Sequence, residues 1–191
     1  MTMPATESIG FHGKLPGVGD FVQRRLPASF VQPWDTHFSV CLDTVRQQLG
    51  ERWPSAYRSS GLRAFALGPG VCGAQAWAGI VGPGEDRVGR CFPLTVALAL
   101  PHPGVPTPAW FGALAACVSR ALRARADAVS FDTALLALTV PATASTVHAP
   151  EHGESLWWRL GAAAQPVRGL PAAEVYLDWL LAEQDITEVT R

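Results

Sequence analysis

The string GFHGKLPGVGD near the start of the chain holds a Gly-Lys pair of the kind found in phosphate-binding loops. A Walker loop, G-x-x-x-x-G-K-[ST], needs a hydroxyl after the lysine to reach magnesium and a helix N-terminus that faces the phosphates. Leu15 follows Gly13 and Lys14, a serine occupies the place of the first glycine, and Pro16 blocks a helix. We therefore predict a strand at residues 9–12 and then a turn through residue 19, with no nucleotide bound.

A second glycine-rich string, GPGVCG at Gly68–Gly73, matches the G-x-G-x-x-G pattern of dinucleotide-binding folds. That fingerprint needs a helix directly after it, so that the pyrophosphate lies on the helix N-terminus. The following residues, AQAWAGIV, are instead typical of a strand. The string thus predicts a glycine turn between two strands.

The string HAPEH, from His148 to His152, has the H-x-x-E-H spacing of inverted zinc proteases. Those histidines bind zinc only when a helix places them on one face, and Pro150 and Gly153 disfavour a helix here. The sequence also has no G-x-S-x-G elbow and no carboxylate pair of recognisable spacing, and no cysteine has an activating neighbour. We therefore expect no catalytic residue, no metal and no cofactor.

Two charged strings stand out, GDFVQRRLP at residues 19–27 and EDRVGR at residues 85–90. In one interpretation Asp20 or Asp86 pairs with an arginine of these strings and ties the first segment to the sheet. In the other, the arginines face outward and bind an acidic or phosphorylated partner, or line a ligand-sensing or enzymatic pocket. The candidate residues for both are Lys14, Asp20, Arg24, Asp86, Arg87 and Arg90.

The composition favours one core-rich domain spanning residues 1–191. Apolar residues make up 48 % of the 191 residues, charged residues 16 %, and the net charge is −1. Without a basic stripe, nucleic acid and anionic membranes are not expected partners. The first seven residues do not read as a signal peptide, and no apolar run reaches the ~18 residues that a membrane span needs. Four scattered cysteines are typical of reduced, buried thiols in a cytoplasmic protein.

Hydrophobic periodicity predicts the elements that position these residues. A helix should begin at Ser29, with a capping box to Gln32, and end at Gly50. Its buried stripe is Phe30, Trp34, Phe38, Leu42, Val45 and Leu49. Strands are expected at Leu62–Leu67, Gln75–Val81 and Phe92–Leu100, with short glycine-rich connections that suit antiparallel neighbours.

The second half of the chain is expected to be mainly helical. Thr107 should cap a helix that begins at Pro108. The other predictions are a short helix at Asp132–Leu138, a loop at Pro141–Gly153, a strand or helical turn at Leu156–Leu160, and a helix from Pro171 to about Ala182. This order predicts an antiparallel or mixed sheet flanked by helices, in the α/β or α+β class.

Several strings in sequence order carry a family resemblance. GFHGKLPGVGDFVQRRLP, LRAFALGPGVCG, AQAWAGIVGP and DRVGRCFPL together resemble the TagF family, also called ImpM, of bacterial type VI secretion accessory proteins. The core motifs lie at residues 10–100, and the helical part at residues 107–191 is compatible with the same single domain.

The resemblance implies a cytoplasmic protein without catalytic activity that represses type VI secretion after translation. It implies a forkhead-associated scaffold protein as partner, and a functional link to a pathway with a serine/threonine kinase and phosphatase. It also implies a longin-like α-β-α sandwich, in agreement with the order of elements above.

Overall fold

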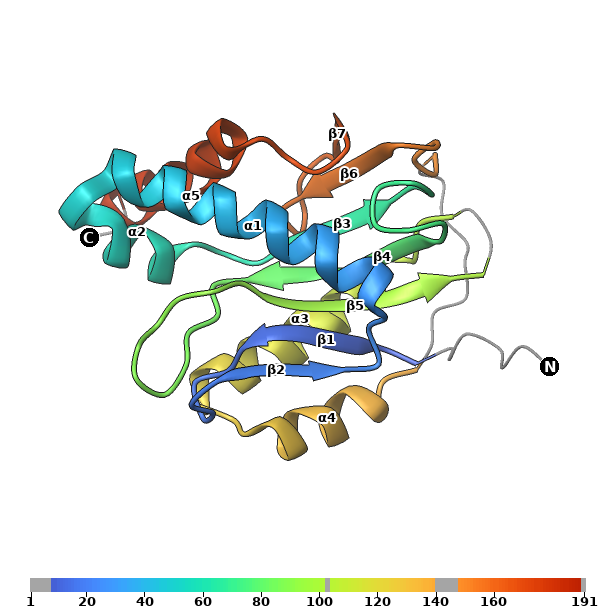
Figure 1. Ribbon diagram of the computed structural model, residues 1–191, viewed down its shortest axis with the longest axis horizontal. Helices are drawn as coiled ribbons and strands as arrows, with labels where there is room; N and C mark the ends of the chain where they lie inside the picture. The colour runs from blue at the N-terminus through green and yellow to red at the C-terminus, as the bar shows by residue number, and fades with distance from the viewer. Residues whose placement is uncertain (1–7, 102–103, 140–147, 190–191) are drawn as a thin grey trace.

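An open antiparallel sheet forms the centre of the protein (Figure 1). The computed structural model describes residues 8–101, 104–139 and 148–189. The strands there are β1 (Gly10–Lys14), β2 (Phe21–Arg24), β3 (Arg63–Leu67), β4 (Ala76–Gly82), β5 (Leu94–Leu100), β6 (Glu154–Trp158) and β7 (Gln165–Arg168). Their order is β2-β1-β5-β4-β3-β6-β7, and every pairing between neighbours is antiparallel. The antiparallel alternative of the prediction is therefore confirmed.

Helices cover both faces of this sheet, which gives the predicted α-β-α sandwich of the α+β class. On one face lie α1 (Ala28–Leu49), the short 3₁₀ turn η1 (Gly50–Arg52), α2 (Trp53–Ser59) and α5 (Ala173–Val189). On the other face lie α3 (Pro108–Arg123) and α4 (Ala128–Leu136). Figure 1 shows α1 crossing the front of the sheet and α3 behind it. Among the described residues, no helix is both long enough and apolar enough to cross a membrane.

Aromatic rings fill the core between the sheet and α1. Trp34 is fully buried, with its ring centroid 5.0 Å from that of Phe65 and 6.0 Å from that of Trp157. Trp157 in turn lies 5.4 Å from Trp179 of α5, so one continuous cluster joins α1, the sheet and α5. Burying side chains of this size stabilises by ~1.5–3 kcal/mol each, which fixes α1 on the sheet.

The core on the opposite face is built from fewer aromatic pairs. Phe11 of β1 meets Phe131 of α4 at 5.1 Å, and Phe111 of α3 meets Trp158 of β6 at 4.9 Å. Because side chains alternate along a strand, His12 and Lys14 project from β1 toward the α1 side. This alternation brings Lys14 to the place where the charged strings meet.

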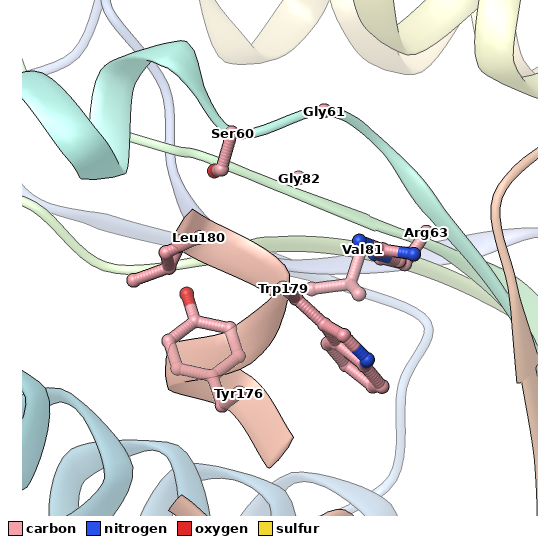
Figure 2. A pocket seen from close by; sticks show the side chains of 8 residues that line it. All are labelled: Ser60, Gly61, Arg63, Val81, Gly82, Tyr176, Trp179 and Leu180. Atoms are coloured by element: carbon pink, nitrogen blue, oxygen red, sulfur yellow. The ribbon is translucent and has the colours of Figure 1, made fainter. Parts of the chain in front are cut away.

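The helix α5 closes the end of the sandwich beside β3 and β4. Figure 2 shows Tyr176, Trp179 and Leu180 of α5 facing Val81 and the Ser60–Gly61 connection. The cavity between them has a volume of about 20 Å³, which is room for about one water molecule. We therefore interpret it as a packing gap between elements.

The start of α1 differs from the prediction. The helix begins at Ala28 with Pro27 as the N-cap residue, and no side chain caps it, so the predicted Ser29–Gln32 capping box is wrong. The carbonyl oxygen of Pro27 accepts from the backbone N–H groups of Phe30 and Val31 instead. The buried stripe and the end at Gly50 are confirmed.

Three short elements were not predicted, namely β2, α2 and β7. Strand β2 buries only Val22, and β7 has no fully buried residue, so neither shows a clear apolar pattern. Helix α2 has seven residues and gives no more than two helical turns. The part predicted to be mainly helical at residues 107–191 thus also contains the strands β6 and β7.

The other predicted boundaries shift by a few residues. Thr107 caps α3 as predicted, because its side chain accepts from the Trp110 N–H. Helix α4 begins four residues early at Ala128, where Asp127 accepts from the Ser130 N–H. Of the two alternatives at residues 156–160, the structure has a strand, and α5 begins at Ala173. Residues 141–147 of the predicted loop lie outside the described residues.

Candidate functional site

The end of β1 lies directly against the chain between β4 and β5. Gly13 has a φ of +130°, and a Cβ atom there would lie 2.0 Å from the Pro93 carbonyl oxygen. A Cβ atom at Gly84 would lie 2.6 Å from the Lys14 carbonyl oxygen. The glycines of the phosphate-loop-like string thus permit close backbone approach, and Lys14 reaches the loop that carries Asp86.

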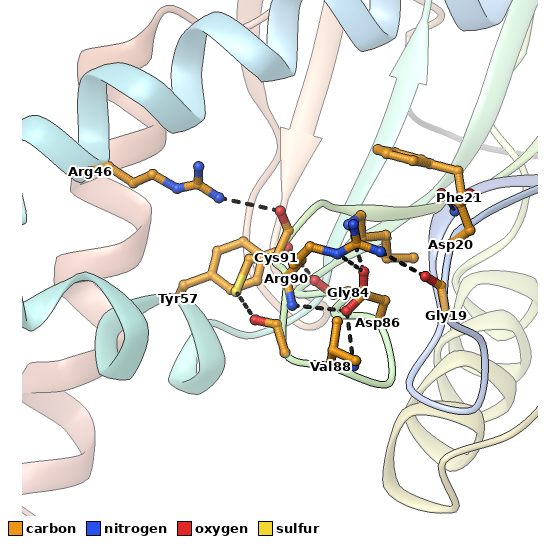
Figure 3. Close-up of polar contacts among 12 residues, drawn as sticks. Gly19, Asp20, Phe21, Arg46, Tyr57, Gly84, Asp86, Val88, Arg90 and Cys91 are labelled. Atoms are coloured by element: carbon orange, nitrogen blue, oxygen red, sulfur yellow. Dashed lines mark hydrogen bonds and ion pairs between the residues drawn. The ribbon is translucent and has the colours of Figure 1, made fainter.

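Asp86 is the centre of the cluster, with its side chain 0 % exposed. Its Oδ2 accepts from Lys14 Nζ at 2.8 Å and from Arg90 Nε at 2.7 Å. Its Oδ1 accepts from the backbone N–H groups of Val88 at 3.1 Å and Arg90 at 2.9 Å (Figure 3). Burial opposes the charged form, but the hydrogen bonds from Lys14, Arg90 and Val88 outweigh it and hold the pKa of Asp86 well below its usual range.

The same loop is tied to the turn between β1 and β2. Arg90 Nη2 donates to the Gly19 carbonyl oxygen at 2.7 Å, and the Arg87 backbone N–H donates to the Val18 carbonyl oxygen at 2.8 Å. Figure 3 shows the Arg90 side chain lying between Asp86 and Gly19. Of the six candidate residues, Lys14, Asp86 and Arg90 therefore form one cluster that ties the first segment to the sheet.

The other three candidates lie outside this cluster and are exposed. Asp20 accepts from the Phe21 N–H at 2.8 Å, and Arg24 donates to the Gln23 carbonyl oxygen at 2.9 Å. Within the described part of the chain, neither they nor Arg87 form an ion pair, so the pairing considered for Asp20 is wrong. Arg25 has a structural role instead, because it pairs with Asp132 of α4.

Residues of α1 and α2 complete the site, and the sequence analysis did not single them out. Tyr57 donates to the Gly84 carbonyl oxygen at 2.9 Å, and Arg58 Nε lies 2.9 Å from Glu85 Oε2. Arg46 donates to the Cys91 carbonyl oxygen at 3.4 Å. Arg46 and Arg58 lie off the apolar stripes of their helices, so only the fold shows what they face.

A groove of about 410 Å³ opens between these elements. Four cationic side chains line it, and within the described residues none of its lining side chains is a carboxylate. The Lys14 ammonium also lies 5.0 Å from the centre of the Phe21 ring. The groove is lined by Lys14, Phe21, Arg46, Trp53, Pro54, Arg58, Gly89, Arg90 and Cys91. Such a surface can bind anions, whereas Asp86 itself has no free side available for acid–base chemistry.

His12 lies beside the groove and was also missed. Its Nε2 is 3.2 Å from Asp35 Oδ1 of α1, and its ring stacks on Phe21 with centroids 5.7 Å apart. Phe92 contacts both rings. The imidazole therefore packs with Phe21 and Phe92 and contacts α1 through Asp35, which holds the partly exposed Phe21 ring in place.

Comparison with known proteins identifies the family. A family model described as the TagF N-terminal domain, type VI secretion system-associated, matches residues 10–138, which is more than half of the chain. The chain belongs to the TagF N-terminal domain family. The resemblance and the association with type VI secretion are therefore confirmed.

A solved structure extends the likeness beyond the matched TagF residues. The crystal structure of PA0076 from Pseudomonas aeruginosa PAO1 is 33 % identical and superposes with a TM-score of 0.78. The match covers 91 % of this chain and 94 % of that one. No curated protein sequence has significant similarity to this TagF domain.

The six candidate residues and the whole cationic groove lie within the matched TagF residues. The elements β6, β7 and α5 follow the matched range and complete the sheet and the α1 side of the core. A second, mainly apolar depression of about 440 Å³ lies on the other face, between α3 and the residues after β6, where Phe111, Trp158 and Leu160 line it.

The remaining two strings of the TagF chain are a turn at Gly68–Gly73 and non-helical chain at His148–His152, as predicted. Gly68–Gly73 joins β3 to β4 and is not followed by a helix. Within it, the Gly70 N–H donates to the Gly73 carbonyl oxygen at 2.8 Å. His148 and His152 lie in non-helical chain before β6. In the described parts of the chain, no group of three His, Cys, Asp or Glu side chains is placed to hold a metal ion.

Proposed function

We propose that this type VI secretion-associated protein represses secretion after translation by binding a forkhead-associated scaffold component in the cytoplasm. In this proposal it acts without catalysis, by occupying a surface of the scaffold that secretion requires. Its link to a serine/threonine kinase and phosphatase pathway is functional, since this protein and that pathway would act on the same scaffold. The observation that carries the proposal is the TagF N-terminal domain match over residues 10–138.

The geometry of the charged cluster supports a binding role. A general acid or base must have a side free for substrate, and all the hydrogen bonds of Asp86 are made to its own loop, Lys14 and Arg90. Arg24 and Arg87 are exposed but do not line the cationic groove, whose cations are Lys14, Arg46, Arg58 and Arg90. The cluster thus supports a rigid surface that a partner protein could recognise.

The cysteine environments support the same conclusion. Burial raises the pKa of Cys41 to about 11 and that of Cys72 to about 12, so both remain protonated at neutral pH. Only a thiolate attacks as a nucleophile, so neither side chain suits covalent catalysis.

A secretion assay tests this proposal in the host bacterium. Deleting the gene should raise type VI secretion even when the kinase is absent, and overproducing the protein should silence it. Scaffold levels should stay constant in both strains, because the proposed block acts after translation. If secretion is unchanged in both strains, the repressor function is wrong.

A second candidate is a ligand- or phosphate-sensing domain, or an enzyme, and the cationic groove is the observation that favours it. A thermal-shift screen against nucleotides, phosphopeptides and metal ions separates it from the binding role. A ligand at 100 times its Kd stabilises by ~2.7 kcal/mol, which is a visible rise in melting temperature. A flat screen would remove this candidate.

A further inference from the structure

We propose that the cationic groove between β1, α1, α2 and the β4–β5 loop is the docking site for an acidic peptide segment of the protein partner. The segment would carry carboxylate side chains and an apolar side chain next to them. This inference rests on the proposed function, because it identifies the surface through which that binding occurs.

The charge of the groove favours an anionic occupant. Lys14, Arg46, Arg58 and Arg90 all line it, although the whole chain has a net charge of −1. Asp86 lies behind the floor, fully buried, and Glu85 pairs with Arg58. Among the ion pairs of the described residues, the remaining one of a lining cation joins Arg46 to the exposed Asp43 at 3.9 Å. The four lining cations therefore outnumber the three paired carboxylates, Asp43, Glu85 and Asp86, and this excess of positive charge favours an anionic partner.

Two of the cations are held in place before any partner binds. Lys14 is buried and fixed by Asp86, and Arg90 is fixed by both Asp86 and the Gly19 carbonyl oxygen. Lys14 uses one of its three N–H donors on Asp86, which leaves donors for an incoming carboxylate. Because these side chains are already ordered, less conformational entropy is lost when an anion binds.

The opposite wall of the groove comes from α1 and α2. The side chains of Arg46 and Arg58 are 43 % and 52 % exposed. Guanidinium groups with free N–H donors bind carboxylates in a bidentate way. The two walls together present cations to both sides of an extended acidic peptide.

Apolar side chains also line the groove. The large apolar side chain of Phe21 is 45 % exposed, and its ring packs against His12 and Phe92. Trp53 lines the groove as well, beneath the Arg46 guanidinium at 5.2 Å. An exposed, rigid aromatic ring beside fixed cations favours a peptide with both acidic and apolar side chains over a simple inorganic anion.

The test uses the full chain and a fluorescently labelled synthetic peptide of glutamates around a single phenylalanine. The groove variant carries both Arg46→Glu and Arg58→Glu. The control variant carries both Arg120→Glu and Arg123→Glu, which makes the same charge change on the exposed side of α3, across the sheet. We expect the groove variant to raise the Kd of the peptide at least about tenfold, the control to leave it unchanged, and added salt to weaken binding to the wild-type protein.

Three results would overturn the inference. One is no peptide binding to the wild-type protein at about millimolar concentration, and another is an equal loss of affinity in the control variant. The third is that a single-stranded oligonucleotide of equal charge binds as tightly as the peptide, because the groove would then be a general anion site. Melting curves check that both variants are folded, and Arg46→Gln with Arg58→Gln replaces the groove variant if the charge reversal unfolds it.

Repeating the titration with the purified scaffold separates this inference from the proposed function. If the scaffold binds the wild-type protein and the groove variant equally, the docking site is wrong and the proposed function stands. If the scaffold fails to bind the wild-type protein while the peptide binds in the groove, the proposed partner is wrong and the acidic-peptide site stands. Loss of scaffold binding in the groove variant alone supports both.

Discussion

Lys14 Nζ lies 2.8 Å from the buried Asp86 carboxylate, although 72 positions separate the two residues in the sequence. The contact joins the end of β1 to the β4–β5 loop, and Arg90 adds a second cation to the same oxygen. A lysine in a phosphate-loop-like string therefore has an internal anion as its partner. The candidate site depends on this pair, because it fixes one wall of the cationic groove.

Replacing Lys14 with alanine should destabilise the protein strongly. Asp86 would remain buried with Arg90 as its one charged donor, and removing one partner of a buried pair costs about 3 kcal/mol. The matched control is Arg87→Ala, whose side chain is exposed and forms no ion pair among the described residues, so its effect should stay within ~0.5 kcal/mol. Urea denaturation measures both. Equal losses in the two variants would contradict the assigned role of Lys14.

The stability of the protein should fall at acid pH because of Asp86. Its pKa is lowered in the folded state, so folding favours the ionised form relative to an unfolded pKa of about 3.9. The stabilisation is thus fully present above about pH 4 and is lost as the pH falls through the folded pKa. Melting temperatures between about pH 6 and pH 2 should drop less steeply for Asp86→Asn than for the wild-type protein.

A second carboxylate serves as comparison for this pH dependence. Hydrogen bonds from the Ser130 backbone and side chain lower the pKa of Asp127, which caps α4. Because Asp127 is exposed, Asp127→Asn should flatten the pH profile less than Asp86→Asn does. If Asp127→Asn flattens the pH profile more than Asp86→Asn does, Asp86 is not the more acid-sensitive of these two carboxylates.

Trp34→Ala should lower the free energy of unfolding by ~3–5 kcal/mol, because it leaves a cavity between α1, Phe65 and Trp157. Val40 lies on the same helix but is 61 % exposed, so Val40→Ala should change stability by less than ~0.5 kcal/mol. Thermal or urea unfolding followed by tryptophan fluorescence measures Val40→Ala, and circular dichroism measures Trp34→Ala. A loss below about 1 kcal/mol for Trp34→Ala would contradict the described core.

Two glycine substitutions should have opposite effects. Gly13→Ala places a Cβ atom 2.0 Å from the Pro93 carbonyl oxygen at a φ of +130°, so we expect little folded, soluble protein. Gly112 lies inside α3 with no atom within 4 Å of its added Cβ, so Gly112→Ala should stabilise by about 0.5–1 kcal/mol. A normal yield of stable Gly13→Ala protein would disprove the close approach of β1 to β5.

The elements that the sequence predicted best are those with long, regular apolar patterns. The stripe from Phe30 to Leu49 repeats over about five turns of α1, and β5 is almost continuously apolar, so both were found. Strand β2 was missed because three of its four residues are exposed, and Pro166 weakens the strand signal of β7. The start of α1 was misplaced because serine is a residue type that often caps helices. Ser29 lies inside α1, and Pro27 is the N-cap residue.

Residue types identified part of the candidate site, and the topology of the sheet decided the rest. The sequence marked Lys14, Asp86 and Arg90 as unusual charges in an apolar chain, but pairing them requires β1 to lie next to β5. Arg46, Arg58 and Tyr57 gave no signal, because helix-surface arginines are common and short helices are poorly marked. The groove is thus a property of tertiary packing, and its cations come from four separate segments.

A calorimetric titration of the purified protein with the purified forkhead-associated scaffold component tests repression by direct binding most directly. We predict a saturable binding isotherm with a Kd in the range of tens of micromolar or below, which corresponds to about −6 kcal/mol or more favourable. Absence of association at tens of micromolar, with both proteins shown to be folded, would contradict repression by direct binding.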